Sequence, residues 1–297
     1  MSRRRTLVSV DLDGIGCYHA IHGLPPPSPG EAGMVLERCL PRFLALFDEL
    51  DVRATFFVIG HELEASPQGA AVLRAALAAG HELGNHSHAH AYDLSRWSAH
   101  AQLEDLARCD AALRAIGADP IGFRAPGYSH DARLLASVDA LGYRYDTSAL
   151  PSPTYYLAKL GAMALHALAG RRSHSLARGA GSFLGPREDH DIAGTALREL
   201  PISAMGPLRL PLVGTFLLAG PRWPRQALRE ASLASARVHL ELHGLDLADE
   251  RDDALSPTLR RVQPELRTPL AIRRERLASW LRARGGAVAL RDAIERV

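Results

Sequence analysis

Glu82-Leu-Gly-Asn-His86-Ser-His-Ala-His90 places two imidazoles, His86 and His90, four residues apart, with His88 between them. On one helical turn, residues i and i+4 project from the same face, so both imidazoles would reach one ion. Neutral imidazole is a common ligand for zinc and its first-row neighbours. Because a catalytic zinc usually has three protein ligands and an open position, a third ligand must come from elsewhere in the chain.

A strand-like segment near the N-terminus offers that third ligand. The alternation in Thr6-Leu-Val-Ser-Val-Asp11-Leu-Asp13 puts Asp11 and Asp13 on one face, at the C-terminal end of the segment. Two carboxylates at the end of a buried strand are costly unless something pairs with them, and a metal ion would do so. The alternative is a pair of solvated loop acids, but the apolar strand before them favours burial.

Strand-like and helix-like segments alternate as far as residue 146. Strands are predicted at 54–60, 81–85, 121–124 and 143–146, and helices at 34–50, 67–79, 97–117 and 131–141. This alternation implies parallel strands joined by right-handed crossovers. The polar candidates share one position, at or just after the C-terminal end of a strand: Asp11, Asp13, His86, His90, Arg124 and Asp146. In barrels and in open α/β sheets, that edge carries the chemistry.

The remaining segments are less regular. Residues 15–33 and 246–267 are predicted to be loops, residues 269–284 a helix and residues 285–290 a short last strand. Residues 150–222 break the alternation and are predicted to be an insertion that forms a lid or a wall at the catalytic edge. Its apolar helix is interpreted as core, with contact to a lipid-linked substrate as the alternative. A late strand, 236–244, carries His239, Glu241 and His243 on one face, which indicates a functional interior.

Composition limits the classes of function. With 297 residues, 47% of them hydrophobic, the chain can bury a substantial core, and one domain over residues 1–297 is the simplest account. The net charge of +2 without a basic stripe excludes nucleic acid as the expected partner. Cys17, Cys39 and Cys109 are widely spaced and are predicted to be free thiols. No stretch of 18 apolar residues or signal-peptide hydrophobic region is present, so a cytoplasmic enzyme is expected, compatible with a homo-oligomer.

Five motifs together resemble one family, the polysaccharide deacetylases with chitooligosaccharide-deacetylase homology (carbohydrate esterase family four). They occur in the order of that family: Asp11-Leu-Asp13, His86-Ser-His-Ala-His90, Arg124-Ala-Pro126-Gly127, Tyr145-Asp146-Thr-Ser and Leu242-His243-Gly. Two features depart from the usual pattern, since Leu12 separates the two acids and the Trp that normally follows the Asp146-type block is missing. In having separated acids, the chain is similar to a subset of the family with peptidoglycan-deacetylase-like, allantoinase-like and deformylase-like members. The resemblance therefore leaves the substrate open.

The resemblance implies a fold and a cofactor. The fold is α/β, a distorted (β/α) barrel of seven or eight units, with residues 150–222 as its insertion. The cofactor is one divalent metal ion, zinc before cobalt, nickel, manganese or iron, and its ligands would be Asp13, His86 and His90.

The resemblance also implies the role of each remaining residue. Asp11 would be the general base, and Arg124 would pair with it and orient it. His243 would be the general acid, with Asp146 as the partner typical of the family; Glu241, on the same strand face as His243, is a second candidate for that partner. The backbone N–H of Gly127 would hold the oxyanion. The residues expected to contact substrate are Pro126, Gly127, Tyr128 and Glu241.

Three functions are compatible with these residues. The first is a metal-dependent deacetylase of an N-acetylated amino sugar or sugar conjugate, acting on a small-molecule or oligosaccharide substrate. The second is an amidase or deformylase acting on a small or lipid-linked, non-polymeric substrate. The third is a non-catalytic barrel that binds carbohydrate, which the full set of acid, base and ligand residues speaks against, because a binding protein needs no paired acid and base.

Overall fold

The computed structural model describes residues 4–168, 183–251, 253 and 255–294. The strands of its main sheet are β1 (Arg5–Asp11), β2 (Thr55–Val58), β3 (Glu82–Asn85), β4 (Gly122–Phe123), β5 (Tyr145–Asp146), β6 (His190–Asp191), β7 (Arg198–Glu199) and β10 (Arg237–His243). Their order across the sheet is β10-β1-β2-β3-β4-β5-β7-β6. All neighbours pair in parallel except β6 and β7, which are antiparallel. The predicted parallel sheet is therefore confirmed through β5, and it continues beyond.

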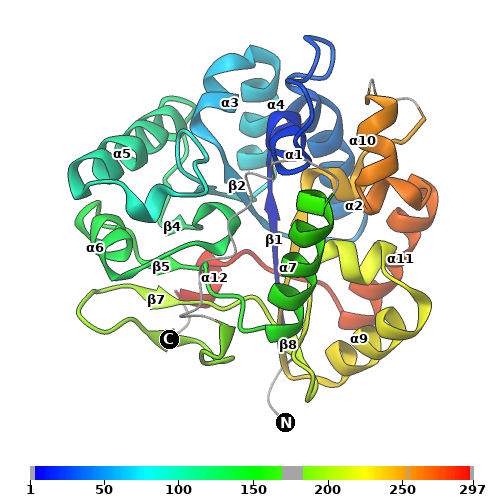
Figure 1. The fold of residues 1–297 in the computed structure, drawn as a ribbon. Coiled ribbons are helices and arrows are strands. Elements are labelled where there is room, and N and C mark those ends of the chain that lie inside the picture. Colours follow the sequence, from blue (N-terminus) through cyan, green and yellow to red (C-terminus); the bar gives the residue numbers. More distant parts are fainter. Residues whose placement is uncertain (1–3, 169–182, 252, 254, 295–297) are drawn as a thin grey trace.

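Helices surround this sheet (Figure 1). The α-helices are α1 (Ile15–Ile21), α2 (Leu40–Glu49), α3 (Gly60–Ala65), α4 (Pro67–Ala78), α5 (Ala99–Ala115), α6 (Ala132–Ala140), α7 (Pro153–Leu168), α9 (Arg222–Ala234), α10 (Pro257–Val262), α11 (Leu270–Arg284) and α12 (Arg291–Ile294). Short 3₁₀ or π turns are η1 (Val35–Cys39), η2 (Leu94–Arg96), η3 (Pro126–Tyr128), η4 (Thr215–Ala219), η5 (Gly244–Leu247) and η6 (Glu265–Arg267). No helix among the described residues is both long and apolar enough to cross a bilayer.

The segment after β7 closes the sheet into a distorted barrel. Ile202 N donates to Ala149 O at 2.9 Å, beside β5. Ser203 N then donates to His239 O of β10 at 3.1 Å, and Leu212 O accepts from Glu241 N at 3.2 Å. The chain between them folds into a small antiparallel pair, β8 (Ala204–Met205) and β9 (Leu210–Pro211). Part of the predicted insertion thus completes the barrel wall.

The alternation along β1 separates the hydrophobic core from the functional interior. Val8 and Val10 are buried in the large core between the sheet and helices such as α2 and α11. Leu7, on the opposite face, packs with Phe57 and other residues in a small apolar layer inside the barrel. Ser9 and Asp11 follow Leu7 on that inner face and are buried as well, although they are polar. Buried polar groups need partners, so the interior above Leu7 must be a polar network.

Several local predictions differ from the structure. Residues 15–21 form α1 and residues 257–262 form α10, although both segments were predicted to be loops. Gly14 precedes α1 and Ser256 precedes α10, and both residue types favour the start of a helix. Residues 285–290 contribute only one isolated bridge, between Val288 and Leu7, in place of a strand. The α7 helix was interpreted as core, but Leu157 and Leu160 are 66% and 48% exposed.

Candidate active site

The histidine motif lies on a loop that follows β3, and it is not the helical turn inferred from its spacing. Asn85 Oδ1 accepts from Ser87 N at 2.8 Å, and Ser87 Oγ accepts from His90 N at 2.9 Å. The carboxylate of Asp105, on α5, accepts from the backbone N–H of the two residues between, His88 and Ala89, at 2.8 and 2.9 Å. Ser87 and His90 have φ values of +63° and +50°, which a helix does not allow. These local hydrogen bonds outcompete helical ones and still bring the two imidazoles together.

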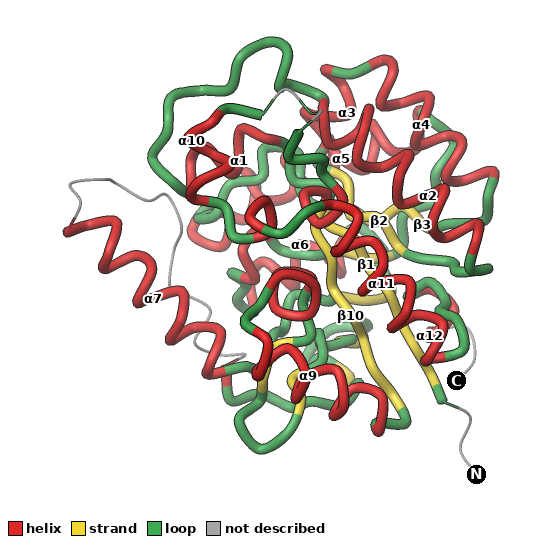
Figure 2. Tube along the Cα trace, turned by 90° about the vertical axis from the view of Figure 1, so that its right-hand side faces the viewer, coloured by secondary structure: helices red, strands yellow, loops and turns green. Residues whose placement is uncertain are grey.

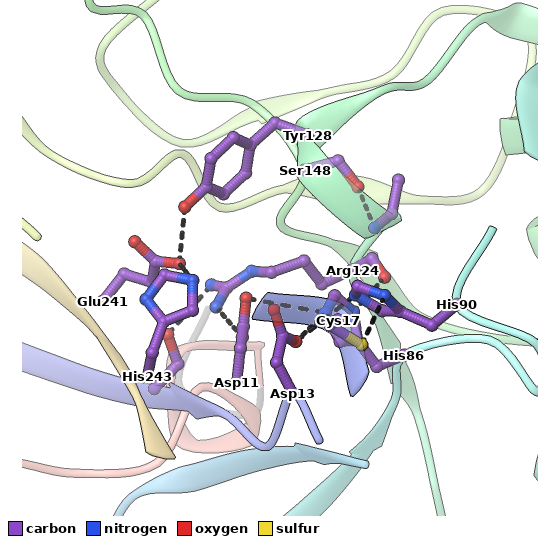
Figure 3. A network of polar contacts seen from close by, with 12 residues as sticks. Asp11, Asp13, Cys17, His86, His90, Arg124, Tyr128, Ser148, Glu241 and His243 are labelled. Carbon is purple, nitrogen blue, oxygen red and sulfur yellow. Dashed lines mark hydrogen bonds and ion pairs between the residues drawn. The ribbon is translucent and has the colours of Figure 1, made fainter. Parts of the chain in front are cut away.

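Asp13, His86 and His90 converge on one point. The Nε2 atoms of His86 and His90 lie 3.2 and 3.3 Å from Asp13 Oδ1, and the two imidazole rings are 4.8 Å apart between centroids. The other ring nitrogen of each histidine is engaged elsewhere: His86 Nδ1 donates to Arg124 O at 2.8 Å, and His90 Nδ1 contacts Cys17 Sγ at 3.3 Å. These contacts orient both Nε2 atoms toward Asp13 (Figure 3).

The donor set fits a divalent metal ion. Asp13 Oδ1 and His90 Nε2 are buried and have no hydrogen-bond partner within the described part of the chain, a costly arrangement that a bound cation would relieve. Burial alone would raise the pKa of Asp13, but the neighbouring imidazoles hold it well below its usual value. Burial lowers the pKa of His90, whereas Cys17 and Asp13 raise it to about 9. A cation bound at this point would displace the protons that these pKa values place on the imidazoles, and it would bind the Asp13 carboxylate in their place.

A second cluster lies next to the first. Asp11, Glu241 and His243 each offer one ligand atom within 4.8 Å of the others. Asp11 Oδ1, however, accepts from Arg124 at 2.5 Å, and Glu241 Oε1 accepts from Tyr128 Oη at 2.7 Å. Because one oxygen of each carboxylate is already engaged, this cluster suits proton transfer, and the Asp13 cluster suits the metal.

Arg124 is fully buried and fixes Asp11. Besides Asp11, its guanidinium donates to Ser9 Oγ at 2.9 Å and to Thr147 O at 3.1 Å, and it lies 4.5 Å above the Phe57 ring. These contacts satisfy the guanidinium on several sides and leave no freedom for the carboxylate oxygen that it holds. The structure thus pairs Arg124 with Asp11, as the resemblance implied.

Glu241 is the carboxylate beside His243. Its Oε1 lies 3.4 Å from His243 Nε2, both residues being on β10. Burial lowers the pKa of His243, but the negative charges of Glu241, Asp13 and Asp11 raise it to about 10. Burial raises the pKa of Glu241 to about 7 against the opposing charge of His243. Of the two partners considered for His243 from sequence, the structure therefore supports Glu241.

Asp146 does not contact His243 in the structure, so its assignment as that partner is wrong. Asp146 instead accepts from Ser148 Oγ at 2.7 Å and from Ser148 N at 3.0 Å, and Ser148 Oγ accepts from Ala125 N at 2.8 Å. The adjacent Glu199 has its pKa raised by burial and by the charge of Asp146. Asp146 therefore supports the turn that follows Arg124.

A cavity of about 310 Å³ opens onto both clusters. Of the residues predicted for the site, it is lined by Asp11, Asp13, His86, Gly127, Tyr128 and His243. Pro126 begins the η3 turn that presents Gly127 and Tyr128. Gly127 has φ +60°, and a Cβ there would lie 2.6 Å from the Tyr92 ring, so only glycine fits. His90 faces a neighbouring cavity of about 610 Å³, which Cys17 also lines.

The cavity also contains residues that the sequence did not single out. Tyr18, Tyr92 and Tyr155 add aromatic faces, and Lys159 adds a cation. Cys17 contacts His90 because residues 15–21 are helical, and that helix was not predicted. One signal was available: Cys17 lies four residues after Asp13, and Tyr92 two residues after His90, so both had to lie near the predicted ligands. His19 and His22 belong to the segment 15–33, which was predicted to be a loop, and they contact Pro25 O and Gln263 Oε1.

Cys17→Ala is expected to lower the affinity for zinc by about tenfold, the lower end of the range for groups that orient a metal ligand. The reason is that Cys17 Sγ is the contact of His90 Nδ1, and its loss frees the ring to rotate. Competition with a chromophoric chelator measures the affinity. Cys39→Ala is the matched control, because Cys39 is buried against Met34 Sδ, and its affinity should stay unchanged. Equal affinities in the two variants would contradict an orienting role for Cys17.

Comparison with known proteins agrees with this geometry. Residues 31–145 match the family model of polysaccharide deacetylases. The peptidoglycan deacetylase-like protein FGM2 of Gibberella zeae is 30% identical over 155 residues, 50% of this chain and 45% of that protein. A chitin deacetylase of Colletotrichum lindemuthianum is 33% identical over 121 residues, 39% of this chain and 47% of that protein. The matches thus span about half the length of these curated relatives.

A solved structure has the same fold along nearly the whole chain. It is that of a candidate polysaccharide deacetylase from Mycobacterium smegmatis, with a TM-score of 0.60 and 19% sequence identity, covering 98% of this chain and 89% of that one. At this identity the likeness shows the fold, and the fold is the distorted barrel expected from the sequence motifs. Residues 31–145 are thus similar to the polysaccharide deacetylase domain, and the chain as a whole has the fold of this solved structure.

Proposed function

We propose that this protein is a metal-dependent hydrolase that removes an acyl group, first of all N-acetyl, from an amino sugar or sugar conjugate. One observation carries the proposal: Asp13, His86 and His90 converge with two ligand atoms unsatisfied, directly beside a second carboxylate, Asp11, and a histidine, His243. The deacetylase family match and the names of the two relatives support it. The predicted cytoplasmic location and the narrower resemblance to enzymes with separated acids stay predictions.

Asp11 is the general base in this proposal. A divalent ion held by Asp13, His86 and His90, zinc first among the candidates, would supply Lewis acidity and lower the pKa of water. Arg124 holds one oxygen of Asp11, while the other, Oδ2, lies 3.7 Å from His86 Nε2 and faces the same point. Asp11 Oδ2 is therefore placed to take the proton of an attacking water.

His243 is the general acid. It lines the same cavity as Asp11 and Asp13, and a departing amine needs a proton from a group that is still charged at the working pH. Glu241 provides that charge state, and Tyr128 Oη, which donates to Glu241, fixes the carboxylate. The acid and the base thus come from neighbouring strands, β10 and β1, whose register pairs His243 with Asp11.

Aromatic side chains shape the space for the substrate. Tyr18, Tyr92, Tyr128 and Tyr155 line the cavity, and flat apolar faces beside a few polar groups suit a sugar ring. The backbone N–H of Gly127 would hold the carbonyl oxygen as it gains charge, because η3 carries this glycine at the cavity wall.

Glu241→Gln is expected to move the alkaline limb of the kcat/KM profile to lower pH. His243 acts as an acid only while protonated, so activity exists below its pKa and is lost as pH rises through it. Its pKa is about 10 because Glu241 and other acids outweigh burial, and loss of the Glu241 charge should lower that pKa by about one to three units. Initial rates measured across the alkaline range test this. An unmoved limb would mean that Glu241 does not control the protonation of His243.

Release of acetate and of formate from a panel of N-acyl amino sugars, with zinc supplied, tests the proposed activity. Acetate release from an N-acetyl sugar supports the deacetylase. The alternative, an amidase or deformylase on a non-polymeric substrate, is favoured by the small cavity and by the α7 side chains at its wall, and formate release would support it. Sugar binding without any turnover in the zinc-loaded protein would contradict both and favour a binding barrel.

A further inference from the structure

We propose that Lys159 binds an acidic group, a carboxylate or a phosphate, on the substrate of this site. The inference rests on the proposed function and narrows it: the substrate would be an anionic derivative of an N-acyl amino sugar, and a neutral chitin-like chain would be a poor one. The chain offers this position a distinctive residue, because Lys159 is its only lysine and every other basic residue in the Lys+Arg total of 35 is arginine.

Lys159 lies on α7 at the wall of the 310 Å³ cavity, together with Tyr155 and Ala158. Its Nζ is 3.9 Å from the place that a Cβ of Gly127 would occupy, and Gly127 lies in the η3 turn that follows Arg124. The ammonium group therefore enters the cavity beside η3. The same cavity is lined by Asp11 and His243, the proposed base and acid, so one ligand can contact all of these groups.

The α7 helix exposes leucine side chains and turns its lysine toward the cavity, the reverse of ordinary helix packing. Leu157 and Leu160, the neighbours of Lys159 on this helix, are 66% and 48% exposed, whereas the lysine turns inward. A surface helix normally buries its leucines and exposes its lysines. Figure 2 shows α7 at the edge of the molecule, apart from the strands of the barrel. Packing does not explain a lysine at this place, but contact with a ligand would.

Lys159 has no countercharge among the residues that the structure describes. No carboxylate of the described residues lies within 4.0 Å of Nζ, and its aromatic neighbour, Tyr155, has its ring centroid 5.9 Å away. Burial lowers the pKa of Lys159 to about 8, without a compensating acid. An ammonium that is largely removed from water and has no partner is costly, and an anionic ligand would offset that cost.

The other charges around the cavity are already matched. Asp11 is bound by Arg124, and Glu241 contacts His243. Of the two other acids that line the cavity, Asp13 lies beside the imidazoles of His86 and His90. Glu265 accepts hydrogen bonds from Thr215 Oγ1 and Gln263 Nε2. Lys159 is thus the cation left available to a ligand among the described lining residues, and a compact ammonium with three donors can bind either oxyanion.

Calorimetric titration of the zinc-loaded Asp11→Asn variant of the 297-residue protein tests the inference, because this background should bind substrates and turn them over slowly. The probes are N-acetylglucosamine, which is neutral, N-acetylglucosamine 1-phosphate and N-acetylmuramic acid, which carries a carboxylate. We expect Lys159→Gln to weaken binding of the anionic probe that fits by about 10–100-fold and to leave N-acetylglucosamine unchanged. Lys159→Arg, which keeps the charge, should retain most of the affinity. The two anionic probes distinguish phosphate from carboxylate.

Zinc itself attracts anions, so the affinity of Asp11→Asn alone would not isolate the effect of Lys159. Adding Lys159→Gln to that protein leaves the zinc site the same, so the difference in affinity between the two proteins reports on Lys159. Equal affinity of the two proteins for both anionic probes would overturn the inference. A preference for an anionic probe that depends on Lys159, in a protein that releases no acyl group from any sugar, would retain the inference and reject the proposed function. Reductive methylation with ¹³C-formaldehyde adds a direct readout, since the only side-chain amine is that of Lys159. Its NMR signal should shift with the anionic probe alone.

Discussion

Asp13→Asn is expected to lose the bound divalent metal and to lower kcat/KM by about 10³-fold or more. Within the described part of the chain, Asp13 Oδ1 is the carboxylate oxygen that lies near both imidazoles, at 3.2 and 3.3 Å from the Nε2 atoms of His86 and His90. The neutral amide is a far weaker ligand, and Lewis-acid stabilisation of several kcal/mol is lost with the metal, each 1.36 kcal/mol being a factor of ten in rate. Elemental analysis after dialysis, with kcat/KM on the same samples, measures both effects.

His88→Ala is the matched control for this prediction. His88 lies inside the same motif, but its Nε2 faces Glu64 Oε2 at 3.2 Å, away from the Asp13 cluster. Its metal content should therefore equal that of the unaltered protein. Should Asp13→Asn keep a full equivalent of metal, the proposed ligand set is wrong, and Asp11, Glu241 and His243 would be the next set to test.

The positions of the site residues that lie on strands or directly after them could be predicted from sequence, because strand geometry determines those positions. Alternation along β1 puts Ser9 and Asp11 on the inner face, and parallel neighbours bring strand ends to one edge. Asp13, His86 and Arg124 follow three different strands, and each lies at that edge. No knowledge of loop structure was needed, since the strands themselves set these positions.

The shape of the histidine loop could not be predicted, because it depends on a residue remote in sequence. Asp105, on α5, accepts two backbone N–H groups of the loop, at His88 and Ala89. Spacing alone is compatible with a helical turn and with this loop, and both bring His86 and His90 to one point. The convergence of the two histidines was thus predicted from a local conformation that the structure does not have.

The partner of His243 depended on tertiary structure in another way. Asp146 ends a strand, as the other site residues do, but its carboxylate is engaged by Ser148 in the turn that follows β5. Glu241 is on β10 itself, two residues before His243, and Tyr128 of η3 orients it. The strict polar alternation of that strand was the sequence signal, and it proved more informative than the position of Asp146.

The orientation of α7 shows a limit of hydrophobic patterns. The helix is apolar on most sides, which favours burial, but periodicity does not say which neighbours a helix has. Only the structure shows that Leu157 and Leu160 face outward and that Lys159 lines the cavity. Residues 169–182, which follow α7, lie outside the described part of the chain, so the predicted lid is represented only by its first helix and by residues 183–222.

Asp11→Asn is expected to lower kcat/KM by about 10²–10⁴-fold while the protein keeps its metal. In this respect it should differ from Asp13→Asn, which is expected to lose the metal. The amide can still accept from Arg124, which contacts Asp11 Oδ1 at 2.5 Å, but it cannot take a proton from water. Kinetics on samples of measured metal content test this. Normal turnover in this variant would remove Asp11 as the base.

A loss of activity in Asp11→Asn could also come from displacement of Arg124, which is fully buried and would lose its countercharge. Breaking a buried ion pair costs up to about 3–5 kcal/mol of unfolding free energy, so a lower melting temperature should accompany the substitution. Ser9→Ala separates the two causes, because it removes another acceptor of Arg124, at 2.9 Å, and leaves the Asp11 carboxylate intact. We expect it to cost about 1–3 kcal/mol of stability and less than about tenfold in kcat/KM. If Ser9→Ala lost as much activity as Asp11→Asn, the effect would follow from the position of Arg124, and the assignment of Asp11 as base would have lost its support.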